Sequence, residues 1–396
     1  MTQPNAPTIA IACGGTGGHL FPGLAVAEQL IKRGCAVTLL VSPKEVDQQA
    51  VKMARGVDIV TLPAVGLQNR NYFSFGASFL KSWSAARKNF RGRKWSAALA
   101  MGGFTSAPPI FAAKQTGAKT FLHESNTIPG KANRWLSRFV DECFVGFPQA
   151  ASRLHNQNVV VTGTPVRPQF QLRDAGACRK ALGLDAERAT ILVMGGSQGA
   201  SGINDLMIRS MGNLKSVSLQ FFHLAGPGDA DKVRQEYARR NLRAVVHSFF
   251  GEMDLALGAA TVAVSRSGAS SLAELAAMRV PPVLVPFPAA TDNHQFFNAK
   301  AFEETGAARL VEQKNATPEA MAWLISGLIE NASAREQMQT ALAKWHAPNA
   351  AEQIAETMLK LIARETEYAG ASTHGAKSGC GCGGEHRAEL RAKTAA

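Results

Sequence analysis

The chain has 396 residues, of which 46% are hydrophobic and 18% are charged, and its formal net charge is +13. This length allows two or three domains with cores of their own, and the composition excludes a fibrous or wholly disordered protein. The excess of Lys and Arg favours an anionic partner, which leaves nucleic acid, a phosphorylated substrate and an acidic membrane open. The sequence shows neither a signal peptide nor an apolar stretch that could span a bilayer, so we expect a protein that stays in the cytoplasm.

Apolar runs of strand length alternate with helical patterns along almost the whole chain, which is typical of βαβ units on parallel sheets. Two series of strands are expected, and each opens with a strand, a glycine-rich turn and a helix. The expected strands are 8–13, 36–41, 97–101, 119–123, 142–146 and 158–162 in the first series, and 190–194, 219–224, 244–247, 261–264, 282–285 and 308–311 in the second. The sequence therefore predicts an α/β protein with two doubly wound, Rossmann-like domains that face each other across a cleft.

Prolines in the segment 163–168 mark the expected boundary between these domains. The expected N-terminal domain spans 1–165 and is completed by a C-terminal helix at about 346–365, and the C-terminal domain spans 166–345. Residues 369–396 are rich in glycine and polar residues, which predicts a disordered tail. This tail contains four residues of types that bind zinc, although the predicted disorder argues against a site: His374, Cys380, Cys382 and His386.

The first glycine-rich turn, "CGGTGGH", joins the first expected strand to a helical pattern over Pro22–Lys32. Glycines at such a turn let a ligand approach main-chain N–H groups, and the start of a helix favours anions. The turn matches no dinucleotide fingerprint, because Leu20 stands where a small residue is required, and no P-loop sequence follows it. A phosphate site and a tight turn with His19 at a helix start both remain open.

Three loops after strands of the second series contain residues suited to a nucleotide sugar. "GGSQGA" puts Ser197 at a helix start, where a diphosphate binds well. "SRSGASSLAEL" supplies Arg266 and Glu274, and Glu274 is either a ribose ligand or part of a capping box. "PFPAATDNHQFFNA" supplies Gln295, which can both donate to and accept from sugar hydroxyls. Since ligands bind at the carboxyl ends of parallel strands, the three loops together favour a nucleotide-sugar diphosphate.

Other polar groups in the two halves allow more than one interpretation. His123 and Glu124 are either an acid–base pair or a buried pair that holds a loop. Asp229 and Asp231 resemble a metal-binding Asp-x-Asp pair, but they precede a helical pattern, so helix capping is expected. We predict no metal and no cofactor.

Residues 70–95 contain seven basic residues and no acid, interleaved with aromatic residues that include Phe79 and Trp83. Basic residues beside exposed aromatics suit an anionic membrane surface. A core helix with a solvated basic face is the alternative, and single-stranded nucleic acid is a weaker one, because no recognition motif accompanies the segment.

Seven motifs in order resemble the MurG family, the bacterial enzymes that add N-acetylglucosamine to the undecaprenyl-diphosphate-linked muramyl-pentapeptide. They are "GGTGGHLFPGLAVAEQL", "MGGFTSAPP", "HESNTIPGKANRWL", "TGTPVRP", "GGSQGASGIN", "SRSGASSLAE" and "PFPAATDNHQFFNA". The resemblance covers about residues 8–363 and implies a GT-B fold, an inverting reaction and UDP-N-acetylglucosamine as donor, held mainly by the C-terminal domain. It further implies a peripheral protein on the cytoplasmic face of the inner membrane.

The residues expected at the donor are Thr16, Gly17, Gly18, Asn126, Arg167, Ser197, the main chain at Phe250, Arg266, Ala269, Ser270, Ser271, Leu272, Ala273, Glu274 and Gln295. The residues expected at the lipid-linked acceptor are Gly14, Gly15, Gly103, Phe104, His123 and Glu124. His19 is the candidate base for the muramyl 4-hydroxyl, with hydrogen bonding to the acceptor as its alternative role. Helix starts and Arg266 can stabilise the leaving diphosphate without a metal.

Three positions depart from the family pattern: Phe104, Ser125 and His294 stand where Tyr, Gln and Gln are usual. The first two affect expected acceptor contacts. Two other functions stay open at this point. One is a related GT-B enzyme acting on another lipid such as diacylglycerol, which the motifs "GGTGGH" and "HESN" argue against, and the other is a basic protein that binds nucleic acid.

Overall fold

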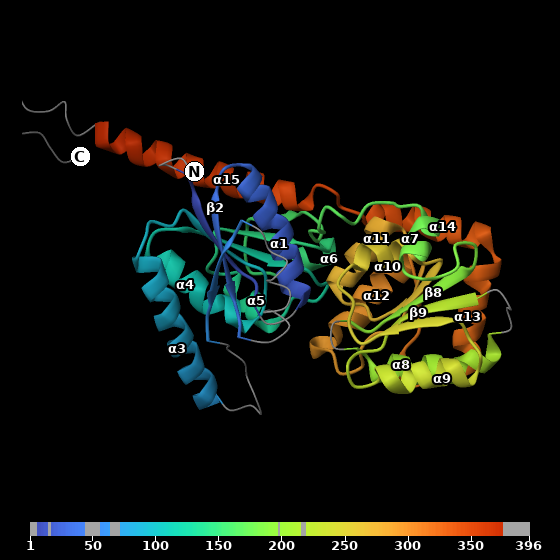
Figure 1. Ribbon diagram of the computed structural model, residues 1–396. Coiled ribbons are helices and arrows are strands. Elements are labelled where there is room, and N and C mark those ends of the chain that lie inside the picture. Colours follow the sequence, from blue (N-terminus) through green and yellow to red (C-terminus); the bar gives the residue numbers. More distant parts are fainter. Residues whose placement is uncertain are drawn as a thin grey trace, which may run out of the picture.

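The computed structural model describes residues 6–14, 17–43, 56–63, 72–196, 199–214 and 219–374. These residues form two parallel sheets that lie side by side (Figure 1). Every expected strand is present with its ends shifted by no more than two residues, and one short strand, Asp58–Thr61, is added at the edge of the first sheet. The predicted α/β architecture is confirmed.

The first sheet has seven strands in the order β3-β2-β1-β4-β5-β6-β7. Their bounds are β1 Thr8–Ala12, β2 Ala36–Val41, β3 Asp58–Thr61, β4 Ala97–Ala100, β5 Lys119–Glu124, β6 Glu142–Val145 and β7 Val159–Val161. The helices of this half are α1 Gly17–Lys32, α3 Tyr72–Arg91, α4 Ala107–Gln115, α5 Lys131–Leu136 and α6 Pro148–Ala151, with the short 3-10 helix η1 Phe104–Ser106. Successive side chains of a strand face opposite sides, so β1 puts Ile9 and Ile11 in one core cluster and Ala10 and Ala12 in another.

The second sheet has six strands in the order β10-β9-β8-β11-β12-β13. Their bounds are β8 Ala189–Met194, β9 Leu219–Leu224, β10 Ala244–His247, β11 Val262–Ser265, β12 Pro282–Leu284 and β13 Arg309–Leu310. The helices of this half are α7 Ala175–Ala181, α8 Ser201–Ser210, α9 Ala230–Arg239, α10 Met253–Ala259, α11 Ala269–Met278, α12 His294–Glu304, α13 Pro318–Glu330 and α14 Ala332–Trp345, and the 3-10 helices are η2 Met211–Asn213, η3 Thr291–Asn293 and η4 Gln313–Asn315. Because β8, β11 and β12 are neighbours, the three loops expected to bind a nucleotide sugar leave the same edge of the sheet.

The last helix, α15 Ala350–His374, returns from the second half and lies along the first (Figure 1). It packs against α1, and Ala351, Ile354 and Met358 lie in the same core cluster as β1. The helix continues beyond the expected end at about 365, and its last turns include the first residues of the segment predicted to be disordered. Cys380, Cys382 and His386 lie outside the described residues, so the zinc hypothesis stays a prediction.

Two connecting segments join the halves, and they touch at Gly163. This residue has φ +80°, and a Cβ atom built on it would lie 2.3 Å from Cβ of Ala347, in the segment between α14 and α15. Both the left-handed backbone and the close contact require glycine. The Gly163 carbonyl accepts a hydrogen bond from Nε2 of His123 at 3.1 Å, which fixes this segment to the end of β5.

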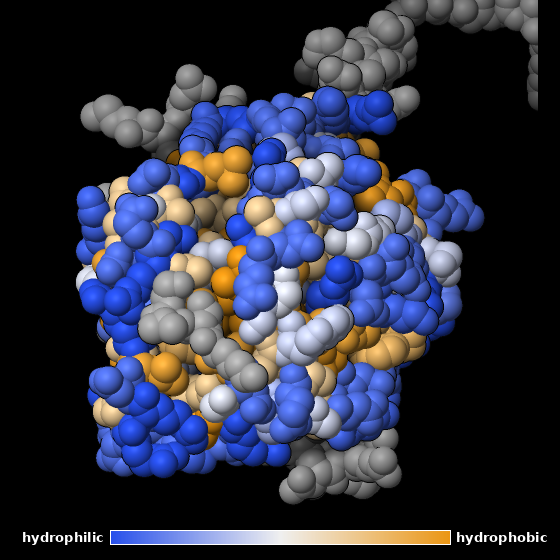
Figure 2. Space-filling view, turned by 90° about the vertical axis from the view of Figure 1, so that its right-hand side faces the viewer, coloured by the Kyte–Doolittle hydropathy of each residue, from blue (hydrophilic) through white to orange (hydrophobic). Residues whose placement is uncertain are grey.

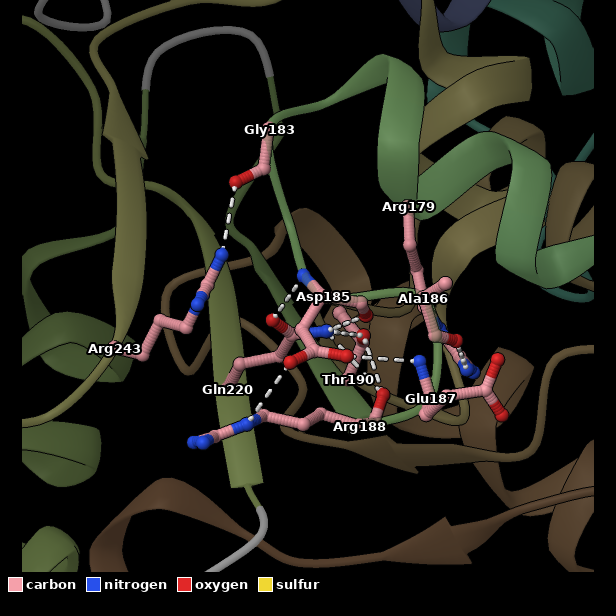
Figure 3. A network of polar contacts seen from close by, with 9 residues as sticks. All are labelled: Arg179, Gly183, Asp185, Ala186, Glu187, Arg188, Thr190, Gln220 and Arg243. Atoms are coloured by element: carbon pink, nitrogen blue, oxygen red, sulfur yellow. Dashed lines mark hydrogen bonds and ion pairs between the residues drawn. The ribbon is translucent and has the colours of Figure 1, made fainter.

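At the amino ends of the strands of the second sheet, the buried side chain of Gln220 on β9 holds the turn that leads into β8 (Figure 3). Its Oε1 accepts from Asp185 N at 2.9 Å, and its Nε2 donates to the carbonyl oxygens of Asp185 and Arg188 and to Oγ1 of Thr190. These partners lie in the turn before β8 and in the first residues of that strand. This network stabilises the sheet far from its carboxyl edge.

The helix α3 carries the aromatic and basic residues expected to contact a membrane. Phe79 and Trp83 are partly buried and pack against the core cluster behind the helix, whereas Leu80 has 61% of its surface exposed. We expected Phe79 and Trp83 to face outward, whereas in the structure the outward-facing apolar side chain is Leu80. In the part of the chain described, no helix is both long and apolar enough to cross a bilayer.

Candidate functional site

The start of α1 meets the start of α11 across the space between the two halves. Pro22 lies inside α1 and has no N–H group, so the Gly18 carbonyl one turn earlier lacks its usual helical donor. Oγ of Ser270, in the first turn of α11, donates to this carbonyl at 2.9 Å. The proline thus frees a carbonyl that holds the glycine-rich start of α1 against the start of α11. The helical pattern expected over Pro22–Lys32 lies within α1, which begins earlier, at Gly17, and so includes His19 in its first turn.

The imidazole of His19 lies directly on the "MGGF" turn after β4. A Cβ atom built on Gly102, which has φ +120°, would be 2.7 Å from Cε1 of His19, and one built on Gly103 would be 3.8 Å from Nε2. At Gly102 only bare backbone leaves room for the ring, whereas at Gly103 a Cβ atom would make an ordinary contact with it. The turn itself is fixed by two hydroxyl groups that the sequence analysis did not single out: Thr105 donates to the Gly14 carbonyl at 2.8 Å, and Ser106 donates to the Gly102 carbonyl at 2.6 Å.

The helix α11 begins at Ala269, and its N-cap residue is Gly268, which provides no side chain to satisfy the first N–H groups. The capping box expected from Ser271 to Glu274 is therefore wrong, since Ser271 already lies inside the helix. Unsatisfied N–H groups at a helix start favour a bound anion. The first turns of α11 contain all the residues expected to bind the donor here: Ala269, Ser270, Ser271, Leu272, Ala273 and Glu274.

The carboxyl group of Glu274 faces Arg167, which comes from the connecting segment after β7. Their closest atoms, Oε1 and Nη2, are 3.6 Å apart, and 8% of the Arg167 side chain and 13% of the Glu274 side chain are exposed. Burial raises the pKa of Glu274 to about 7, and the positive charge of Arg167 acts in the opposite direction. The guanidinium of Arg167 also lies 4.2 Å from the ring centre of Phe21 on α1, so this one side chain contacts both halves.

Two further polar side chains hold the loop between β12 and α12. Arg266 donates to the carbonyl oxygens of Val285 and Pro286 at 2.9 and 3.0 Å, and burial lowers its pKa to about 10, so it remains a cation at neutral pH. Oε1 of Gln295 accepts from Phe287 N at 2.9 Å. Both expected donor residues thus also hold the loop between β12 and α12, Arg266 from the end of β11 and Gln295 from the first turn of α12.

Comparison with known proteins identifies this arrangement. The N-terminal domain of glycosyltransferase family 28 matches residues 9–145, and the C-terminal domain of the same family matches residues 190–354. The chain belongs to glycosyltransferase family 28.

Named relatives extend the family 28 match to nearly the whole chain. The UDP-N-acetylglucosamine--N-acetylmuramyl-(pentapeptide) pyrophosphoryl-undecaprenol N-acetylglucosamine transferase of Anaeromyxobacter sp. is 34% identical over 361 residues, which are 89% of this chain and 93% of the relative. The protein of the same name from Natranaerobius thermophilus is 31% identical and is covered over 100% of its length. The crystal structure of Acinetobacter baumannii MurG matches with a TM-score of 0.70 and 28% identity, over 89% of this chain and 100% of that one. The resemblance and the GT-B fold predicted from the motifs are confirmed.

Within the family 28 fold, His123 and Glu124 are buried and fully engaged. Nδ1 of His123 accepts from the Ser125 hydroxyl, Nε2 donates to Gly163, and burial lowers the pKa of the ring to about 4, so the imidazole is neutral. The Glu124 carboxylate accepts four hydrogen bonds from Asn126, Gly130 and Asn133 at 2.8 to 3.0 Å. Of the two roles considered from the sequence, these contacts favour the pair that holds a loop.

The remaining expected site residues divide into described and undescribed ones. The ring of Phe104 packs edge-on against Phe75 at 5.3 Å, and Phe250 lies partly buried against Phe222, after β10. Gly15, Thr16 and Ser197 lie outside the described residues, and Gly17 is the first residue of α1.

The Asp-x-Asp pair serves neither as the expected cap nor as an evident metal site. Asp229 is the N-cap residue of α9, but its side chain makes no capping hydrogen bond to this helix and instead accepts from Nδ2 of Asn204 at 2.8 Å. Asn204 also bonds to the buried His223, which bonds to Tyr237. Asp231 pairs with Arg234. Over the described ranges no group of His, Cys, Asp and Glu side chains is arranged to hold a metal ion.

Proposed function

We propose that this chain transfers N-acetylglucosamine from UDP-N-acetylglucosamine to the undecaprenyl-diphosphate-linked N-acetylmuramyl-pentapeptide, the step that converts lipid I to lipid II in peptidoglycan synthesis. The printed names of its relatives describe this transfer. The structural observation that carries the proposal is the hydrogen bond from Ser270 to Gly18, because it brings an uncapped helix start of one half beside His19 of the other.

The second half suits the donor. The N–H groups at the start of α11, together with Ser197, bind the diphosphate, and the ionised Glu274 accepts from the two ribose hydroxyls. The main chain at Phe250 contacts the uracil, and Gln295 contacts the sugar. From the other side, the donor is contacted by four residues of the first half, Thr16, Gly17, Gly18 and Asn126. Arg167 contacts it from the connecting segment.

The first half suits the acceptor, with its diphosphate near Gly14 and Gly15 and its sugar near Gly103 and Phe104. His19 takes the proton of the muramyl 4-hydroxyl as the oxygen bonds to the anomeric carbon. The bond from that carbon to the diphosphate breaks, and its electron pair leaves with UDP. A single displacement of this kind inverts the anomeric configuration. Helix starts stabilise the charge that develops on the leaving diphosphate.

The acceptor is a membrane lipid, so the enzyme works as a peripheral protein on the cytoplasmic face of the inner membrane. The exposed Leu80 on α3, flanked by Lys81, supports contact through this helix, and the net charge of +13 favours an anionic surface. Figure 2 views the molecule from the side of the second half, and the coloured part of this face is largely hydrophilic, with hydrophobic residues in small separate groups. That face offers less support for membrane contact than α3 does.

The proposal is tested by incubating the purified chain with UDP-N-acetylglucosamine, a short-chain analogue of the muramyl acceptor and EDTA. Mass spectrometry of the lipid product should show the addition of one N-acetylhexosamine. Release of UDP without a modified acceptor would contradict the proposal, because water would then be the acceptor.

A further inference from the structure

Polar side chains from both halves converge on Asn298, a residue of α12 that has no exposed surface. Its Oδ1 accepts from the backbone N–H and from the hydroxyl of Thr127, each at 2.9 Å. Its Nδ2 donates to Oδ1 of Asn126 at 3.0 Å and to the carbonyl of Ser267 at 3.1 Å. We call these four residues, Asn126, Thr127, Ser267 and Asn298, the amide bridge.

The amide bridge fixes one orientation of the Asn298 side chain. Its oxygen accepts two hydrogen bonds and its nitrogen donates two, so every hydrogen-bonding group of the amide is used. Exchanging the oxygen and the nitrogen would leave the N–H of Thr127 facing a donor and the Ser267 carbonyl facing an acceptor. Because Thr127 and Ser267 are buried, water cannot replace the lost partners, and the mismatch carries the full cost of unsatisfied polar groups.

Each partner of Asn298 belongs to a segment that faces the candidate site. Asn126 and Thr127 belong to the loop after β5, whose other side is held by the four hydrogen bonds to Glu124. Ser267 directly precedes the N-cap of α11, and its hydroxyl donates to the carbonyl of Gln295 at 2.7 Å. The amide bridge therefore joins a hydrogen-bonded loop of the first half to the start of α11 and, through Ser267, to Gln295 on α12 of the second half.

A second set of contacts joins neighbouring elements of the two halves at the surface. Asp292 of η3 lies 3.1 Å from Arg134 and 3.9 Å from Lys131, both on α5, and all three side chains are partly exposed. Exposed ion pairs contribute little free energy, since water and salt screen them. Of these two sets of contacts, the buried amide bridge therefore contributes more to how the two halves fit together here.

We propose that Asn298 is a positioning residue for sugar transfer, which holds the loop at Asn126 in register with the start of α11. This inference rests on the proposed function and adds to it a residue that touches neither reacting atom. Transfer by in-line attack depends on the relative position of groups from the two halves, so loosening the bridge lowers turnover. Binding of UDP depends mainly on the second half and should change little.

The main variant is Asn298→Ala, and the chain offers a matched control in Gln220→Ala. Gln220 is also a buried amide of the second half whose hydrogen bonds hold one turn, but this turn lies at the far edge of the sheet (Figure 3). Both variants should melt several degrees below the parent. Only Asn298→Ala should lower kcat, by at least tenfold, with the Kd of UDP within threefold of the parent value.

Thr127→Val is the milder variant, in case Asn298→Ala does not fold. It keeps the shape of the side chain and removes only the hydroxyl donated to Asn298, so kcat should fall by about three- to tenfold in a folded enzyme. A kcat of Thr127→Val within twofold of the parent, or an equal loss in Gln220→Ala, would overturn the proposal.

Hydrogen exchange tests the bridge independently of activity. The peptide that covers residues 125–130 should take up deuterium faster in Asn298→Ala than in the parent, and at the parent rate in Gln220→Ala. If the parent shows no transfer to the muramyl acceptor, the proposed function fails. Hydrogen exchange then still shows whether the amide bridge holds the loop at residues 125–130. Unchanged exchange of the peptide in Asn298→Ala would refute the bridge itself.

Discussion

The raised pKa of Glu274 predicts that donor binding weakens as the pH falls from 8 to 6. An ionised carboxylate accepts from both ribose hydroxyls, whereas the protonated acid offers fewer acceptor sites and carries no charge. Burial next to Arg167 gives this group a pKa of about 7 in the free enzyme. The binding-competent form is therefore the major one above that pH and the minor one below it.

The size of the effect follows from this pKa. About nine-tenths of Glu274 is ionised at pH 8 and about one-tenth at pH 6, from the pKa of about 7. If only the ionised form binds, the apparent Kd rises by the inverse of the ionised fraction, which is about tenfold across this range. By linkage, binding at pH 6 releases close to one proton and binding at pH 8 releases almost none.

Isothermal titration calorimetry with UDP-N-acetylglucosamine measures the Kd and the number of protons released, provided that each pH is covered by two buffers of different ionisation enthalpy. This donor is preferable to UDP, because its diphosphate has no group that titrates near neutral pH. The matched variant Glu274→Gln should bind more weakly at pH 8 and show no pH dependence. A parent Kd that is flat between pH 6 and 8, or an equal slope in Glu274→Gln, would refute the role of this carboxylate.

Three further predictions concern the membrane, the connecting segments and the base. Leu80→Glu should weaken sedimentation with phosphatidylglycerol vesicles, and Trp323→Glu, which changes a side chain that is 75% exposed on α13 of the second half, should not; equal losses would remove α3 as the contact. Gly163→Ala should lower the free energy of unfolding by about 2–5 kcal/mol in denaturant titrations, because it combines left-handed backbone strain with a steric overlap. The control is Gly117→Ala, since Gly117 also has φ +80° but no atom within 4 Å of its Cβ position, so this variant should show only the loss from backbone strain. His19→Ala should lower kcat by about 10²- to 10⁴-fold with little change in the donor KM, and a change in KM alone would contradict its role as the base.

The sequence predicted the sheets because their signal is local. Buried parallel strands are continuous apolar runs, and such runs are visible in one dimension. The strand Asp58–Thr61 was missed for the same reason, since it lies at the edge of the sheet with mostly exposed side chains and contains only two apolar residues in its four positions.

The helix starts were predicted less well, because their stabilising partners are distant in sequence. The helical pattern was visible only from Pro22 onward, although α1 begins at Gly17, and the carbonyl that the proline leaves free is satisfied by Ser270 of the other half. Glu274 matched a capping box, but its partner is Arg167, which belongs to the connecting segment. No local pattern reports either contact.

The same limit applies to the polar residues of the site. The sequence marked Asn126 and left Asn298 as one of several polar residues in a loop, while Thr127 gave no signal at all. A buried amide that bonds across two halves is defined by tertiary packing, and its residue type alone does not distinguish it from a solvated asparagine.

The most direct test of the central claim is a competition for radiolabelled N-acetylglucosamine between two lipid acceptors in the same vesicles. The purified chain is given UDP-N-acetylglucosamine, a short-chain undecaprenyl-type muramyl-pentapeptide and diacylglycerol at equal concentrations, with EDTA present. The account predicts that the label enters the muramyl acceptor. Label in diacylglycerol alone would contradict the account and assign the chain to a different acceptor within the same fold.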